Sequence, residues 1–313
     1  MTNILFLGNC QINAMRGIAR GMFPHMPCDF RTITPYWGTF DEVEIRARLA
    51  RADLVISQAI ANPDTPLNVA DVRAATQGQV VFLPYIYIDG IAGLEIVASK
   101  GKSVIRGAEA IVAAWQGRKT IKVLEDYVAG RIDMGNAARV TASLTKLAAN
   151  EAAHCDIVIS DYIAGTLRSQ PALWAINHPT QHILFEMFRR LCDHVGWRYD
   201  AGFRDNLVAW DQRALPKSTR ALSPYDVDAL RLSYPHDTHW FGQANKMITQ
   251  AIKQAQQAAQ APRVAVPVAS HPGYTMPARL SKARLKRPAE VAAHGGQPGA
   301  AAGTRFAVHS PVR

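Results

Sequence analysis

The chain has 313 residues, 48% of them apolar and 19% charged, which is enough for one large domain or two small ones with a sizeable core. The net charge of +10 is unevenly distributed, because residues 262–313 carry eight Lys or Arg and one Glu, whereas the other 261 residues carry 27 basic and 24 acidic groups. The globular part is therefore nearly neutral, and its composition does not predict nucleic-acid binding.

Four widely spaced cysteines without a Cys-x-x-Cys pair favour neither a zinc site nor a disulfide framework. No complete cluster of metal ligands is evident, so no metal is predicted. Free thiols fit a reducing cytoplasm. No apolar run approaches the ~20 residues of a membrane helix, and the run Ile4–Leu7 is too short for a signal peptide. We therefore expect a cytoplasmic protein that contacts membranes at most peripherally.

The first predicted element is a buried strand, Ile4–Leu7, because four consecutive apolar residues end at Gly8. From Gln11, apolar residues recur at three- and four-residue steps, which predicts a helix. Cys10 therefore lies where a strand turns into a helix. The unpaired N–H groups of a helix N-terminus favour the nucleophilic thiolate, which predicts a low pKa, and could also hold an oxyanion. The alternative is a small buried cysteine at a tight turn.

Strands and helices alternate over the next part of the chain. Further strands are predicted at 28–33, 53–57 and 79–83, with helices at 41–52 and 69–76. This alternation is typical of a parallel sheet with crossover helices, and thus of an α/β fold.

Residues 91–155 have a mostly helical pattern, clearest at 120–129 and 137–154, and we interpret them as a helical insertion or lid. A strand at 173–176 and helices at 180–194 and 240–258 complete an α/β domain over residues 1–261. Residues 262–313 contain seven prolines and eight basic residues, which predicts a disordered tail. A patch for an anionic membrane or polymer is the alternative for this tail.

Polar side chains follow several of the predicted strands. They are Cys10, Gln58, Tyr85 and the pair Asn177-His178. Ligands of open parallel sheets bind beyond the carboxyl ends of the strands. We therefore expect these residues to converge on one rim, with ordinary loop chemistry as the alternative.

A thiol nucleophile needs a base within hydrogen-bond reach. Two histidines compete for this role, His178 after the late strand and His239 before the last helix. His239 lies in Asp237-x-His239, one residue shorter than the Asp-x-x-His block of SGNH-type esterases. His182 is a weaker candidate.

Two motifs carry a resemblance to a known family, Gly8-Asn9-Cys10-Gln11 after the first strand and Asn177-His178-Pro179-Thr180 after the late one. Ser57-Gln58 and Phe82-Leu83-Pro84-Tyr85 fall between them, where the family has similar pieces. Over roughly residues 1–255 the sequence resembles the WcbI-type polysaccharide biosynthesis enzymes. Residues 7–10 are more distantly similar to the Gly-Asp-Ser block of SGNH-type esterases, with Cys for Ser and Asn for Asp, and an SGNH or flavodoxin-like sheet is therefore expected.

The resemblance implies an acetyltransferase that takes its acyl group from acetyl-CoA and acts on a capsule or other surface sugar or its polysaccharide precursor. Cys10 and a histidine base would then perform the chemistry. Substrate or oxyanion contacts would come from Asn9, Gln11, Gln58, Tyr85 and Asn177, and contacts with the coenzyme A phosphates from Arg16, Lys102 and Arg106. The alternatives are an SGNH-like carbohydrate esterase and a non-catalytic glycan- or nucleotide-binding protein.

Overall fold

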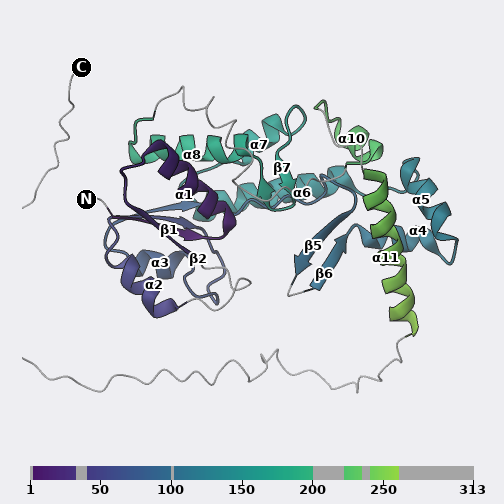
Figure 1. Ribbon diagram of the computed structural model, residues 1–313, viewed down its shortest axis with the longest axis horizontal. Coiled ribbons are helices and arrows are strands. Elements are labelled where there is room, and N and C mark those ends of the chain that lie inside the picture. The colour runs from purple at the N-terminus through teal and green to yellow at the C-terminus, as the bar shows by residue number, and fades with distance from the viewer. Residues whose placement is uncertain (1–2, 33–40, 100–101, 200–221, 235–239, 261–313) are drawn as a thin grey trace, which may run out of the picture. The chain divides into compact units, whose positions relative to one another are not determined.

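The structure is a computed structural model, which describes residues 3–32, 41–99, 102–199, 222–234 and 240–260 (Figure 1). Its main sheet has four strands in the order β2-β1-β3-β4. They are β1 (Ile4–Gly8), β2 (Cys28–Thr32), β3 (Leu54–Gln58) and β4 (Gln79–Leu83). Every neighbouring pair is parallel. The predicted α/β fold with a parallel sheet and crossover helices is confirmed.

Helices cover both faces of this sheet (Figure 1). Ile4 and Phe6 of β1 pack with α1 (Cys10–Met22) and α8 (Gln181–Val195), whereas Leu5 and Leu7 pack toward α2 (Glu42–Leu49) and α3 (Val69–Ala75). Successive side chains of a strand point to opposite faces, so an all-apolar strand is buried on both. The uninterrupted apolar run of β1 therefore specifies a central strand.

The region predicted as a helical insertion begins with an antiparallel hairpin, β5 (Glu95–Ser99) and β6 (Lys102–Arg106). The helices α4 (Ala108–Trp115), α5 (Thr120–Val128) and α6 (Asn136–His154) follow it. The expectation of a mostly helical region missed this hairpin. Its signal was short, since two pairs of β-branched residues flank a Lys-Gly sequence.

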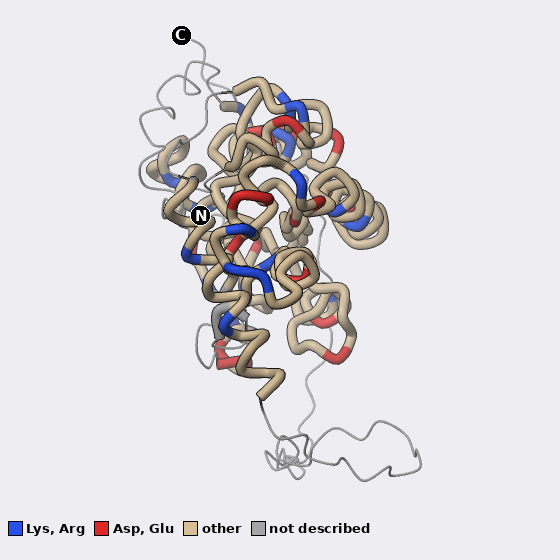
Figure 2. The backbone as a smooth tube through the Cα atoms, turned by 90° about the vertical axis from the view of Figure 1, so that its right-hand side faces the viewer, with Lys and Arg blue, Asp and Glu red and all other residues tan. Residues whose placement is uncertain are grey.

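A second hydrophobic core forms around α11 (Trp240–Gln260), which packs against α4 and α5 (Figure 1). Met247, Ile248 and Ile252 of α11 are buried there with Ile105 of β6. The α4–α5 region is thus completed by a helix from more than 100 residues further along the chain. Lys and Arg are interspersed with Asp and Glu along the described backbone (Figure 2).

The late strand does not join the main sheet. β7 (Leu173–Ala175) instead pairs antiparallel with the two-residue β8 (His178–Pro179), so the expected parallel placement of this strand is wrong. A chain that reverses within a few residues can pair only antiparallel. The remaining described helices are α7 (Ser160–Thr166) and α10 (Pro224–Leu230).

None of the helices in the described residues is both long and apolar enough to cross a bilayer. The predicted tail at 262–313 lies outside the described residues, as does His239. The disorder of this tail and its contact with a membrane stay predictions from the sequence.

Candidate active site

The turn between β1 and α1 places Cys10 as the first residue of the helix. Asn9 is the N-cap, and its Oδ1 accepts a hydrogen bond from the backbone N–H of Gln11 at 2.9 Å. A Cβ atom on Gly8 would lie 2.4 Å from Cγ1 of Ile12 and 3.1 Å from Cβ of Gln58. Glycine is therefore required for the close approach, and the end of β3 lies directly beside this turn.

Gln11 joins three segments of the chain. Its Nε2 donates to the carbonyl oxygens of Ile86 at 2.8 Å and Asn177 at 2.7 Å, and its Oε1 accepts from the backbone N–H of Ile86 at 3.1 Å. The side chain is fully buried. Both amide protons are used within the protein, so Gln11 links these segments, and its predicted contact with substrate stays a prediction.

The Gln11–Asn177 hydrogen bond brings the two sequence motifs together. Cys10 precedes Gln11, and the half-buried His178 follows Asn177, so each candidate catalytic residue is a chain neighbour of a bonded residue. His182 is directed elsewhere, because its Nε2 lies 2.9 Å from the carbonyl oxygen of Pro171. The segments of Cys10 and His178 thus lie side by side, with His178 in the small hairpin β7–β8, and the convergence of their side chains on one rim stays a prediction.

Tyr85 lies beside the same junction. The Nδ2 of Asn177 donates to the Tyr85 hydroxyl at 3.4 Å, and the Tyr85 ring lies 6.2 Å from the ring of Tyr87. Tyr85 is 41% exposed, which is unusual for an aromatic side chain beside a buried core. This ring is accordingly accessible to a ligand.

Gln58 presents an unused donor at the end of β3. The residue is only 6% exposed, and its buried Nε2 has no hydrogen-bond partner among the described residues. An unsatisfied buried amide costs ~1–3 kcal/mol, so such groups call for an explanation. Because Cβ of Gln58 lies beside Gly8, this residue belongs to the surroundings of the β1–α1 turn, and its contact with a ligand stays a prediction.

The acidity of Cys10 differs from the prediction. Burial raises the pKa of its thiol, and the backbone N–H groups of Gln11 and Cys10 only partly oppose that shift. The predicted low pKa is therefore wrong, because desolvation of the thiolate exceeds the effect of the helix N–H groups. Burial also raises the pKa of Cys28, and it is the largest cause raising the pKa of Cys155 and of Cys192 to about 12.

The predicted phosphate-binding residues Arg16 and Arg106 have different surroundings. Burial raises the pKa of Tyr87 and the nearby charge of Arg106 lowers it, so Arg106 lies beside the aromatic pair. Lys102 begins the same strand, β6. Arg16 instead lies 5.5 Å from the ring centroid of Phe30 on β2. Arg106 is thereby connected through Tyr87 to the neighbourhood of Tyr85, and the phosphate contacts of the three residues stay predictions.

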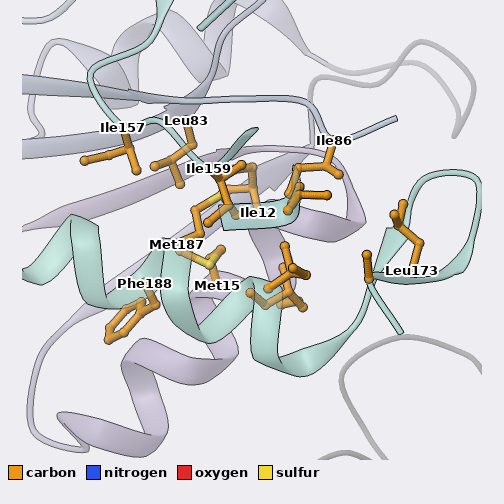
Figure 3. Close-up of a cluster of buried hydrophobic side chains, with 14 of the residues drawn as sticks. Ile12, Met15, Leu83, Ile86, Ile157, Ile159, Leu173, Met187 and Phe188 are labelled. Carbon is orange, nitrogen blue, oxygen red and sulfur yellow. The ribbon is translucent and has the colours of Figure 1, made fainter. Parts of the chain in front are cut away.

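An apolar layer supports the rim (Figure 3). Ile12, which follows Gln11, and Ile86, which Gln11 binds through its backbone, are both fully buried in the main core with Met187 of α8. Figure 3 shows Ile86 beside Ile12, with Leu173 of β7 further along. The polar rim is therefore fixed on a closely packed base, which favours a preformed site.

The sequence did not single out Glu95, which contacts this rim from β5. Its carboxylate Oε1 accepts a hydrogen bond from the backbone N–H of Ile176 at 2.7 Å, two residues before His178. An acidic residue at the start of an apolar strand was the available signal. Sequence spacing alone could not connect it with a segment 81 residues away.

Comparisons with known proteins give a family match and a structural match. A family model described as polysaccharide biosynthesis enzyme WcbI matches residues 3–200, whereas no curated protein matches. A solved structure of WcbI, described as the native protein without a disulfide bond between coenzyme A and a cysteine, matches with a TM-score of 0.56 and 15% identity. This match covers 82% of the present chain and 97% of that one, and it shows a shared fold. Because the family model spans more than half of the sequence, this protein belongs to the WcbI family of polysaccharide biosynthesis enzymes.

Proposed function

We propose that this protein is an acetyltransferase that moves an acetyl group from acetyl-CoA to a sugar hydroxyl during the synthesis of a capsule or another surface polysaccharide. The observation that carries the proposal is the Gln11–Asn177 hydrogen bond, which brings the segments of Cys10 and His178 together. Membership of the WcbI family supports a sugar or polysaccharide precursor as acceptor. The coenzyme A and cysteine named for the solved WcbI structure support coenzyme A as the carrier. We expect the reaction in the cytoplasm, where free thiols persist.

The chain has candidate groups for binding both the thioester and the phosphates of acetyl-CoA. The first N–H groups of α1 and the unused Nε2 of Gln58 would stabilise the oxyanion that forms on the thioester carbonyl. Asn9 would hold this turn in shape through its N-cap bond. Arg106 and Lys102 would meet the phosphates.

In direct transfer, a histidine accepts the proton of the sugar hydroxyl while the hydroxyl oxygen attacks the carbonyl carbon of the thioester. The carbon–sulfur bond then breaks, and the coenzyme A thiolate leaves with the proton from the imidazolium. His178 is the preferred base because its turn is bonded to Gln11. His239 keeps its place as the alternative base.

In the covalent route, the same base first removes the thiol proton of Cys10. The Cys10 sulfur attacks the thioester carbonyl carbon, the carbon–sulfur bond to coenzyme A breaks, and the coenzyme A thiolate takes the proton from the imidazolium. The base then removes the proton of the sugar hydroxyl as its oxygen attacks the acetyl carbon on Cys10, and the Cys10 thiolate leaves and regains that proton. The raised pKa of Cys10 makes the base necessary in this route, since only a small fraction of the thiol is ionised near pH 7.

The test is an acetyl-transfer assay with acetyl-CoA and nucleotide sugars, preceded by a thermal-shift measurement with coenzyme A. A ligand that binds only the folded state raises the melting temperature, and the increase grows with the ratio of the ligand concentration to its Kd. We expect His178→Ala to lower turnover by roughly 10²–10⁴-fold, as is typical for loss of general acid–base catalysis. His182→Ala is the matched control and should retain turnover, because His182 contacts Pro171.

Gln58→Ala should lower turnover by roughly 10²–10³-fold if Gln58 donates to the oxyanion. Full activity of both His178→Ala and Gln58→Ala would contradict this assignment of the site. Hydrolysis of acetylated sugars without any effect of coenzyme A would indicate an esterase instead. Binding of coenzyme A or glycans without turnover would indicate a binding protein.

A further inference from the structure

We propose that Glu95 is a positioning residue for the acetyl-transfer site, which holds the Ile176–His178 turn against Gln11. This inference rests on the proposed function for its catalytic consequence. Glu95 belongs to β5, in the hairpin that precedes the second core, and not to either sequence motif. A residue outside the motifs would thus set the placement of the base.

The contact of Glu95 is of a strong kind. Glu95 is only 8% exposed, and its Oε1 accepts a hydrogen bond from the Ile176 N–H at 2.7 Å. This separation is at the short end of the range for N–H···O hydrogen bonds. A buried polar group is costly without a hydrogen bond, so the bond to Oε1 holds the Ile176 N–H in place.

The turn is held from several directions at once. The carbonyl oxygen of Ile176 accepts from the N–H of Ile88 at 2.8 Å, and that of Asn177 accepts from Gln11 at 2.7 Å. Glu95 binds the remaining polar group of the Ile176 peptide, its N–H. With Glu95 removed, Ile176 keeps one of its two backbone bonds, and the direction in which His178 leaves the turn becomes less fixed.

The hairpin itself is anchored in the second core. Leu94, which precedes Glu95, is 3% exposed there with Ile105 of β6. Arg106, the cross-strand partner of Glu95, lies beside Tyr87 in the loop after β4. The start of β5 thus joins the second core to two loops of the candidate site.

The experiment compares Glu95→Ala and Glu95→Gln with a matched control, Glu151→Ala. Glu151 is another buried carboxylate that accepts a backbone N–H, that of Ile159 at 2.9 Å, at the junction of α6 and α7. Turnover per folded molecule and hydrogen exchange of the peptide over residues 172–180 are measured for each variant.

Glu95→Ala should lower kcat by roughly 10–100-fold with KM for acetyl-CoA changed less than about threefold, because a misplacement of ~1 Å costs about 10² in rate. It should also speed exchange at Asn177 and His178. Glu95→Gln should recover most of the turnover, since its amide oxygen can still accept from Ile176. Glu151→Ala should leave both kcat and this exchange unchanged.

Unchanged exchange and unchanged kcat in Glu95→Ala would overturn the proposal, as would a kcat loss of the same size in Glu151→Ala. Faster exchange with normal kcat would limit Glu95 to a structural role and also overturn it. If the unaltered protein transfers no acetyl group, the proposed function fails. In that case unchanged exchange in Glu95→Ala refutes the positioning of the turn, whereas faster exchange retains it.

Discussion

The two hydrophobic regions of this protein are assembled in different ways. The layers around β1–β4 are built on the central strands β1 and β3, whose residues are all buried, and the first four strands and three helices follow one another within residues 4–83. The second core combines β6, α4 and α5 with α11 from the end of the described chain. The first region is therefore specified mainly by local pattern, and the second by a long-range contact.

Buried polar contacts also join the second region to the chain around it. The fully buried Asp226 of α10 accepts hydrogen bonds at 2.8 Å from the N–H of Gly93, from Nδ2 of Asn136 and from the N–H of Ser223. Burial raises the pKa of Asp226, and these donors oppose the shift. The long-range assembly thus depends on directional bonds as well as on apolar area.

The largest expected effect comes from removing α11 by ending the chain at residue 239. Met247, Ile248 and Ile252 would lose their burial against the second core, at ~1.5–3 kcal/mol for each side chain. The total rivals the stability of a typical domain. We expect fast hydrogen exchange over α4 and α5, and a loss of cooperative melting.

The matched control ends the chain at Ala261, which keeps the whole of α11 and removes the predicted tail. This variant should melt at the same temperature as the full chain. Slow exchange over α5 in the shorter variant would show that the second core stands without α11, and the contrast between the two regions would then be lost.

This contrast also explains what could be predicted from the sequence. The strand ends near Cys10, Gln58 and Tyr85 could be predicted because the spacing of apolar residues within a short stretch of sequence indicates where a strand begins and ends. The sequence could not show that His178 lies in an antiparallel hairpin, or that Glu95 binds the turn of that hairpin, because both depend on tertiary packing. The acidity of Cys10 was mispredicted for a related reason, since the extent of burial follows from tertiary packing.

A smaller effect is expected from Gly8→Ala, which tests the local region. The added Cβ would lie 2.4 Å from Cγ1 of Ile12, and overpacking of this kind typically costs ~1–3 kcal/mol. Urea unfolding should show this loss. Gly165→Ala is the control, because no atom lies within 4 Å of a Cβ atom there. Equal stability of the two variants would mean that the β1–α1 turn can relax, and that its geometry is less fixed than its packing implies.

The last prediction concerns the order in which the cysteine thiols react with an alkylating reagent, and it involves no change in the stability of the protein. Only the thiolate is alkylated, so below its pKa the rate rises about tenfold for each pH unit. Because burial raises the pKa of Cys10, iodoacetamide should react slowly with it at pH 7 and much faster at pH 9. Cys155 and Cys192, with pKa values raised to about 12, should stay slower than Cys10 throughout this range. Peptide mapping at both pH values measures the order, and coenzyme A should slow the reaction of Cys10 if it binds at this rim. A rate for Cys10 that is already maximal at pH 7 would show that the helix N–H groups outweigh burial after all, and that the thiolate needs no base to form.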